Sequence, residues 1–89
     1  MNIVVVGTGY VGLVTGVGLA EQGHRVSFID LDDTKIQKLK DKQLPFFEPD
    51  LNNYFEKDEN FNRMSFHSNY KSLDWQLTDI VFICVQTPN

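Results

Sequence analysis

Three glycines near the amino terminus have the spacing of a phosphate-binding turn. Gly7, Gly9 and Gly12 form the pattern G-x-G-x-x-G, and an acidic residue, Asp30, follows later in the chain. The first glycine permits a tight turn, the second lets the backbone approach a pyrophosphate, and the third allows a helix to pack closely on a sheet. A carboxylate placed about 20 residues further on accepts hydrogen bonds from a ribose. The spacing therefore predicts a dinucleotide site, and a glycine-rich turn that serves only packing is the alternative.

Four other residues complete the predicted site. The N–H groups of Tyr10 and Val11 open the helix that follows the glycine turn, where the helix dipole favours phosphates. The Asp30 carboxylate would repel a 2′-phosphate, so we expect NAD as the cofactor rather than NADP. Lys35 lies in the first turn of the next predicted helix and is either a contact to the adenosine half or a solvated lysine. Thr87 ends the last predicted strand and is either a cofactor contact or part of a plain turn.

The elements that must position these residues follow from the hydrophobic pattern. The β-branched run at 3–6 and the apolar run at 80–85 are typical of core strands in a parallel sheet. The alternation of strands and helices predicts an α/β fold, a Rossmann-type parallel sheet with flanking helices. We predict strands over 3–6, 25–30, 64–66 and 80–85, helices over 10–22, 34–41, 50–55 and 69–76, and a turn over 57–62.

Local signals predict how these helices pack and where they end. Gly12, Gly16 and Gly18 lie inside one predicted helix, where each costs about 1 kcal/mol relative to alanine. We therefore expect the helix backbone to approach a strand or a ligand closely there, and Gly23 to end the helix in a left-handed conformation. The next two helices are expected to be capped by acidic side chains: Asp32 or Asp33, and Asp50.

Composition limits the classes of function. The chain has 89 residues and a formal net charge of −4, so it lacks the clustered Lys and Arg that nucleic acid requires. No run reaches the roughly 18 apolar residues that span a bilayer, and the amino terminus does not resemble a signal peptide. The lone Cys84 is expected to be a buried small hydrophobe, and His67 has no partner for a metal site. We expect a cytoplasmic protein without metal, membrane or nucleic-acid partners.

Four motifs occur together in a characteristic order and spacing. They are Val4 to Leu13, Asp30 with Lys35, Pro45 to Leu51, and Val85 to Pro88. In combination they resemble the N-terminal NAD-binding domain of the UDP-glucose/GDP-mannose dehydrogenase family. The resemblance covers essentially the whole chain, with departures at Asp50 and Gln86, where the family often has glycine. It implies NAD contacts at Gly7, Gly9, Tyr10, Val11, Gly12, Asp30, Lys35 and Thr87.

The resemblance also implies an activity for the whole protein. Members of the family oxidise the C6 alcohol of a nucleotide sugar to a carboxylate with two NAD in succession, through a catalytic cysteine assisted by lysine, asparagine and aspartate. In the family those residues, the nucleotide-sugar domain and the dimer-forming helix all follow the region that resembles residues 1–89. We therefore expect a truncated N-terminal part without catalytic residues, inactive alone, and a homodimer or higher homo-oligomer at full length.

Two alternatives stay open at this point. Hydroxyacid and hydroxyacyl-CoA dehydrogenases begin with the same glycine turn, although they do not share the spacing of Glu48-Pro49 and Thr87-Pro88. A truncated module that binds nucleotide weakly and catalyses nothing is the second alternative.

Overall fold

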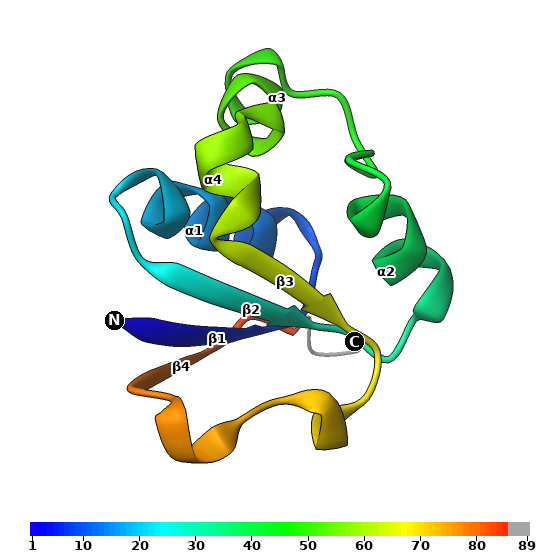
Figure 1. The fold of residues 1–89 in the computed structure, drawn as a ribbon. Coiled ribbons are helices and arrows are strands. Elements are labelled where there is room, and N and C mark those ends of the chain that lie inside the picture. Colours follow the sequence, from blue (N-terminus) through cyan, green and yellow to red (C-terminus); the bar gives the residue numbers. More distant parts are fainter. Residues whose placement is uncertain (86–89) are drawn as a thin grey trace.

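The computed structural model describes residues 1–85, which form a four-stranded parallel sheet with helices on its faces (Figure 1). The strand order is β3-β2-β1-β4, and all three strand pairs are parallel. This architecture confirms the predicted Rossmann-type α/β fold. The elements are β1 (Asn2–Val6), α1 (Tyr10–Glu21), β2 (Arg25–Ile29), α2 (Asp33–Lys40), α3 (Pro49–Glu56), α4 (Asp58–Asn62), β3 (Met64–His67), the 3₁₀ turns η1 (Tyr70–Ser72) and η2 (Trp75–Leu77), and β4 (Ile80–Ile83).

The strand order reverses between β1 and β4, and this reversal decides which face each connection covers. The chain moves from β1 outward to β2 and β3, then returns past β1 to form β4. Because crossovers between parallel strands are right-handed, the returning connection must cross the opposite face of the sheet. Figure 1 shows this arrangement, with α1, α3 and α4 above the sheet and η1 and η2 below it. The reversal creates a crevice beside the carboxyl end of β1.

Two of the three glycines inside α1 are explained by close packing. A Cβ on Gly12 would overlap the carbonyl oxygen of Gly7, and a Cβ on Gly16 would overlap the ring of Phe28 in β2. At Gly18 the predicted close approach to a strand is wrong, because a Cβ there would meet no protein atom within 4 Å. Gly18 lies on the exposed side of the helix, so strand packing does not explain it.

The end of α1 follows the predicted pattern. Gly23 has a φ of +101°, the left-handed conformation expected after the last helical turn. Its N–H donates to the carbonyl of Ala20 at 3.0 Å, and the His24 N–H donates to the carbonyl of Leu19 at 3.1 Å. This pair of hydrogen bonds is a Schellman motif, which satisfies carbonyls that the helix itself leaves unpaired.

The later helices confirm one predicted cap and correct another. Asp32 caps α2, because its side chain accepts hydrogen bonds from the N–H groups of Thr34 and Lys35. Asp50 does not cap α3, since that helix already begins at Pro49, whose ring suits the first helical position. Residues 57–62, predicted as a turn, contain the short helix α4.

An aromatic cluster joins these helices to the sheet. The ring of Phe28 in β2 stacks on that of Phe66 in β3 at 5.4 Å between centroids, and Phe55 of α3 packs against Phe66 at 6.0 Å. Phe28 and Phe55 are fully buried, as are Ile36 and Leu39 of α2. The core therefore lies between the sheet and these helices, where it holds α1 mainly against β2 and α2 against β3.

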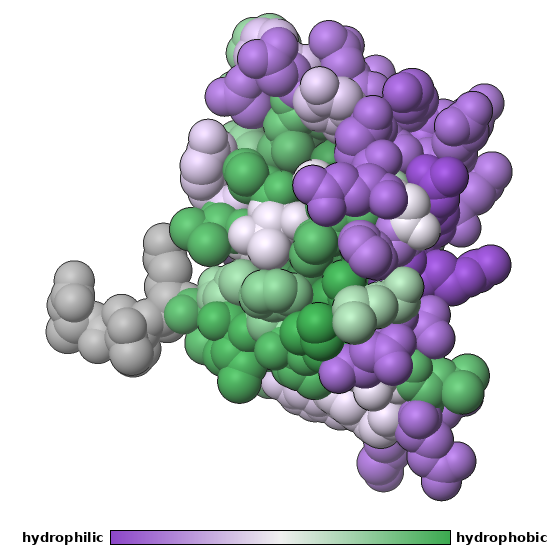
Figure 2. All heavy atoms as spheres, turned by 90° about the vertical axis from the view of Figure 1, so that its left-hand side faces the viewer, coloured by the Kyte–Doolittle hydropathy of each residue, from purple (hydrophilic) through white to green (hydrophobic). Residues whose placement is uncertain are grey.

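The last strand differs most from its prediction. It ends at Ile83 rather than at 85, and its residues are exposed, from 37% at Ile80 to 74% at Ile83. The cause is position, because β4 pairs with β1 on one side and has no strand partner on the other among the described residues. Figure 2, seen from the left of Figure 1, shows hydrophobic side chains concentrated across the middle and lower part of this face, with smaller groups at its top and lower right.

Candidate dinucleotide-binding site

Four of the predicted site residues, Gly7, Gly9, Asp30 and Lys35, meet at the carboxyl ends of β1 and β2, next to the end of β4. The register pairs Val6 with Ile29 and with Ile83, so the residues that follow these strands emerge side by side. Ligands of open α/β sheets bind where the strand order reverses, which in this chain is between β1 and β4. A cavity of about 280 Å³ lies at this point, lined by Gly7, Thr8, Gly9, Asp30, Lys35, Cys84 and Val85.

The glycine turn has the backbone that its sequence predicts. Gly7 has a φ of +103°, and a Cβ there would lie 3.0 Å from the carbonyl group of Cys84. Its N–H donates to the Ile29 carbonyl at 2.8 Å, which ties the turn to the end of β2. A Cβ on Gly9, in contrast, would meet nothing within 4 Å. The turn is thus closed against the sheet at Gly7 and open at Gly9, the side from which a phosphate would approach.

The amino end of α1 lies beside this open side. Gly9 is the N-cap, it has no side chain to cap the helix, and the first turn contains no acidic residue. The first helical hydrogen bond runs from the Leu13 N–H to the Gly9 carbonyl at 3.0 Å. Within residues 1–85, the N–H groups of Tyr10 and Val11 have no hydrogen-bond acceptor. Uncapped N–H groups at the positive end of a 12-residue helix suit an anion such as a pyrophosphate.

Asp30 is held by hydrogen bonds at both of its carboxylate oxygens. Oδ2 accepts from the N–H of Thr8 at 3.0 Å and from its hydroxyl at 2.7 Å, while Oδ1 accepts from the N–H of Asp32 at 2.9 Å. Partial burial acts to raise the pKa of the Asp30 carboxyl, but these hydrogen bonds and the charge of Lys35 lower it below its usual value. The carboxylate is therefore ionised and oriented in the cavity before any ligand binds.

The remaining predicted contacts have different outcomes. Lys35 lines the same cavity as Asp30, in agreement with a position on the adenosine side. Thr87 and Gln86 lie outside the described residues. The Tyr10 ring is 58% exposed and packs against Phe46 at 5.2 Å, so it is the backbone of Tyr10 that faces the glycine turn.

One residue of the site was missed in the sequence. Thr8 occupies the variable position between two glycines of the motif, which carries no expectation about its side chain. In the structure it is completely buried, and both of its donors reach Asp30. A hydroxyl residue directly after the first glycine, paired with an acidic residue at the end of the next strand, is the signal that could have revealed it.

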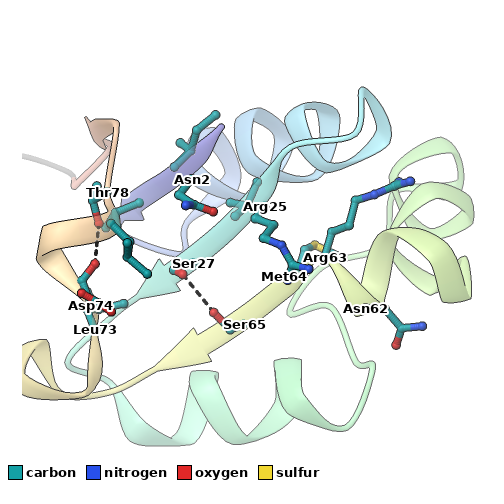
Figure 3. Close-up of a pocket in the computed structure, with 14 residues that line it drawn as sticks. Asn2, Arg25, Ser27, Asn62, Arg63, Met64, Ser65, Leu73, Asp74 and Thr78 are labelled. Carbon is teal, nitrogen blue, oxygen red and sulfur yellow. Dashed lines mark hydrogen bonds between the residues drawn. The ribbon is translucent and has the colours of Figure 1, made fainter.

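A second cavity, of about 210 Å³, lies on the face of the sheet that η1 and η2 cover, opposite the face covered by α1 (Figure 3). It is lined by the amino-terminal halves of β1, β2 and β3, away from the glycine turn. Ser27 and Ser65 hydrogen-bond to each other there at 3.0 Å, and the Thr78 hydroxyl donates to the Asp74 carbonyl at 3.1 Å. Because the glycine turn and Asp30 line the first cavity and not this one, we assign the cofactor to the cavity at the glycine turn.

Two classes of site are not found in the described part of the chain. Within residues 1–85, no group of three or more His, Cys, Asp or Glu side chains is arranged to hold a metal ion. No helix in that range has the length and apolar composition to cross a membrane.

Comparison with known proteins identifies the family. Residues 1–89 match the model of the UDP-glucose/GDP-mannose dehydrogenase family, NAD binding domain. The chain belongs to this family. The match establishes NAD as the cofactor of the domain and sets aside the hydroxyacid and hydroxyacyl-CoA dehydrogenases as alternatives. It also confirms the resemblance drawn from the four sequence motifs.

Relatives within the family differ in their named substrates. The chain is 48% identical over 88 residues to UDP-glucose 6-dehydrogenase YwqF of Bacillus subtilis (strain 168), covering 99% of this chain and 20% of that protein. A GDP-mannose dehydrogenase from Pseudomonas aeruginosa is 34% identical, with a TM-score of 0.86 over 99% of this chain and 20% of the solved chain. A UDP-N-acetyl-mannosamine dehydrogenase from Staphylococcus aureus is 29% identical, with a TM-score of 0.85 over 100% of this chain and 20% of the solved chain. The chain thus spans about a fifth of the length of these relatives.

Proposed function

We propose that residues 1–89 are the NAD-binding portion of a UDP-sugar 6-dehydrogenase. Such an enzyme oxidises the C6 alcohol of UDP-glucose, or of a related UDP- or GDP-sugar, to the carboxylate with two NAD. The observation that carries the proposal is the 48% identity to a UDP-glucose 6-dehydrogenase over 99% of this chain. Among the solved relatives, one named for GDP-mannose is 34% identical and one named for UDP-glucose is 32% identical, so the choice of UDP-glucose rests on the curated relative alone.

In this proposal the domain binds and orients the cofactor, which supplies the acceptor for a hydride from the sugar. The N–H groups of Tyr10 and Val11 hold the pyrophosphate at the open side of Gly9. Asp30 accepts hydrogen bonds from the adenine ribose, and Lys35 contacts the adenosine half from the same cavity. The complete set of proposed NAD contacts is Gly7, Gly9, Tyr10, Val11, Gly12, Asp30, Lys35 and Thr87.

We also propose that this domain is the N-terminal part of a longer enzyme and is inactive by itself. The support is that the chain corresponds to about a fifth of its relatives' length, and that the cavity, as residues 1–85 line it, contains binding groups but no hydrogen-bonded pair of nucleophile and base. Its one thiol, Cys84, is half-buried and packs against the core. A cytoplasmic location, a nucleotide-sugar site elsewhere in the protein and assembly as a homodimer or larger homo-oligomer are predictions that accompany this proposal.

The test uses the full-length gene product that contains these residues. Purified protein is supplied with NAD and, separately, UDP-glucose, GDP-mannose or UDP-N-acetyl-mannosamine, and NADH is followed by its absorbance. We expect UDP-glucose to give the highest kcat/KM and two NADH per sugar. Preference for GDP-mannose or UDP-N-acetyl-mannosamine would overturn the substrate, and no NADH with any of the three would overturn the proposed activity.

A matched control tests the claim about the isolated domain. Residues 1–89 produced alone are assayed with the same sugars and NAD under the same conditions. We expect no turnover, because the domain holds only the cofactor half of the reaction. Sustained NADH formation by residues 1–89 would show that the catalytic groups lie within this domain and would refute the proposal that they lie elsewhere.

A further inference from the structure

Thr8 has a contact that its place in the glycine motif does not require. Its side chain is fully buried, and its hydroxyl donates to Asp30 Oδ2 at 2.7 Å. The residue is remote from Asp30 in the sequence but adjacent in space, because the register pairs Val6 with Ile29 just before each of them. Phosphate binding uses the backbone of this turn, so a hydroxyl at this position has no role in the phosphate site itself.

The direction of the Thr8 donors is the informative feature. Both its N–H and its hydroxyl donate to the same oxygen of Asp30, so neither is directed toward the open side of the turn. The other oxygen accepts from the N–H of Asp32 at 2.9 Å. Three donors on two oxygens fix the rotation of the carboxylate about both of its side-chain torsions. An ionised carboxylate offers about four acceptor positions, so capacity for a ribose hydroxyl is left.

Orientation matters because of what the carboxylate must recognise. A ribose diol needs an acceptor at a defined angle, whereas a 2′-phosphate at the same place is repelled by the negative charge. A carboxylate that rotates freely can turn away from a 2′-phosphate and lose much of that repulsion. A fixed carboxylate meets both ligands in the same geometry, which increases the difference in affinity between NAD and NADP.

We propose that Thr8 is a positioning residue that holds the Asp30 carboxylate in place for the adenine ribose and thereby sets the preference for NAD over NADP. The inference rests on the proposed NAD site and adds to it a residue that acts through Asp30. Thr8 contributes two of the three hydrogen bonds that hold the carboxylate, and only the one from its side chain can be removed by substitution.

The test compares side-chain variants in the full-length gene product. Thr8→Val keeps the shape and removes the hydroxyl, Thr8→Ser keeps the hydroxyl and removes the methyl group, and Thr15→Val makes the same exchange inside α1. Dissociation constants for NAD and NADP are measured by calorimetry over a range of pH. We expect Thr8→Val to weaken NAD binding about tenfold, which corresponds to about 1.4 kcal/mol. NADP binding should weaken less, so that the ratio of the NADP dissociation constant to the NAD dissociation constant becomes smaller.

Two further readouts separate positioning from a general loss of structure. The lost hydrogen bond no longer favours the ionised carboxylate, so the pKa of Asp30 should rise in Thr8→Val. As the pH is lowered, this variant should therefore lose NAD binding at a higher pH than the unsubstituted protein. Thr8→Ser should restore both the affinity, to within about twofold, and the pH profile. Thr15→Val should match the unsubstituted protein. If Thr8→Val does not fold, Thr8→Ala removes the same hydroxyl without a replacement methyl group and is measured instead.

The outcomes distinguish this inference from the function on which it rests. If the unsubstituted protein binds NAD, and the variant without the hydroxyl has the same affinity, NADP preference and pH profile, the positioning role is overturned and the NAD site stands. An equal loss of NAD and NADP binding would also overturn it, since this result indicates general damage. If the unsubstituted protein shows no saturable NAD binding, the proposed function fails and the inference fails with it.

Discussion

Two alanine substitutions in the same helix should change stability in opposite directions. Gly16 and Gly18 both lie inside α1, and each gains helix propensity, about 1 kcal/mol, when replaced by alanine. They differ in what the new methyl group meets. At Gly16 it would overlap two ring carbons of Phe28 and lie 3.3 Å from a methyl group of Val26, whereas at Gly18 it meets nothing within 4 Å.

The size of the effect follows from how freely the neighbours can move. Phe28 is fully buried and stacked on Phe66 at 5.4 Å, so its ring cannot turn aside without disturbing the core. Overpacking of this kind costs about 1–3 kcal/mol, and this site belongs at the upper end. After the gain in propensity, Gly16→Ala should destabilise the domain by about 2 kcal/mol. Gly18→Ala should stabilise it by about 0.5–1 kcal/mol.

Native-state hydrogen exchange in the full-length gene product measures this difference for the domain alone. The slowest amides of β1 report the free energy of opening of this domain, even when other domains are present. We expect slower exchange in Gly18→Ala and faster exchange in Gly16→Ala than in the unsubstituted protein. Faster exchange in both variants, or no change in Gly16→Ala, would refute the claim that contact with Phe28 decides the outcome.

Three other predictions concern the cofactor site, the exposed strand and a half-buried histidine. Asp30→Ala should weaken NAD binding by about 1–3 kcal/mol and raise affinity for NADP relative to NAD, as measured by calorimetry; an unchanged ratio would exclude Asp30 as the discriminating group. Ile83→Lys should reduce the self-association that we expect of isolated residues 1–89, measured by analytical ultracentrifugation, because Ile83 is 74% exposed on β4, whose outer edge has no strand partner among residues 1–85. His67 should titrate below 6.5 by NMR, since burial and the charge of Lys40 lower its pKa. Because the folded state favours neutral His67, its contribution to stability is present above pH 6.5 and is lost as the pH falls through the lowered pKa.

The glycine turn could be predicted because its physics is local. Gly7 needs a left-handed φ, and Gly12 must lie against the Gly7 carbonyl, so both requirements arise within six residues of chain. The strand that precedes the turn and the helix that follows it are read from their own hydrophobic patterns. Asp30 could be added because it ends the next strand, and parallel strands bring their carboxyl ends to one edge.

The errors occur where an element depends on its neighbours in space. The apolar run at 80–85 has the composition of a core strand, but composition cannot show that β4 lies at an edge of the described sheet. Gly16 and Gly18 are the same residue type in the same helix, and only the position of Phe28 on β2 distinguishes their surroundings. Asp50 is a good capping residue, yet Pro49 had already begun the helix one position earlier.

The sequence by itself determined the type of fold, the place of the phosphate turn and, through four spaced motifs, the family. These features depend on the backbone conformation and the hydrophobic pattern of residues that are close together in the sequence, so the order of residue types is enough to predict them. Only the tertiary structure decided that Thr8 holds the carboxylate of Asp30. That contact depends on the register between β1 and β2, which brings the residues that follow these two strands to hydrogen-bonding distance. Pairing across a sheet is a property of strands in contact, so the identity of either residue alone does not reveal it.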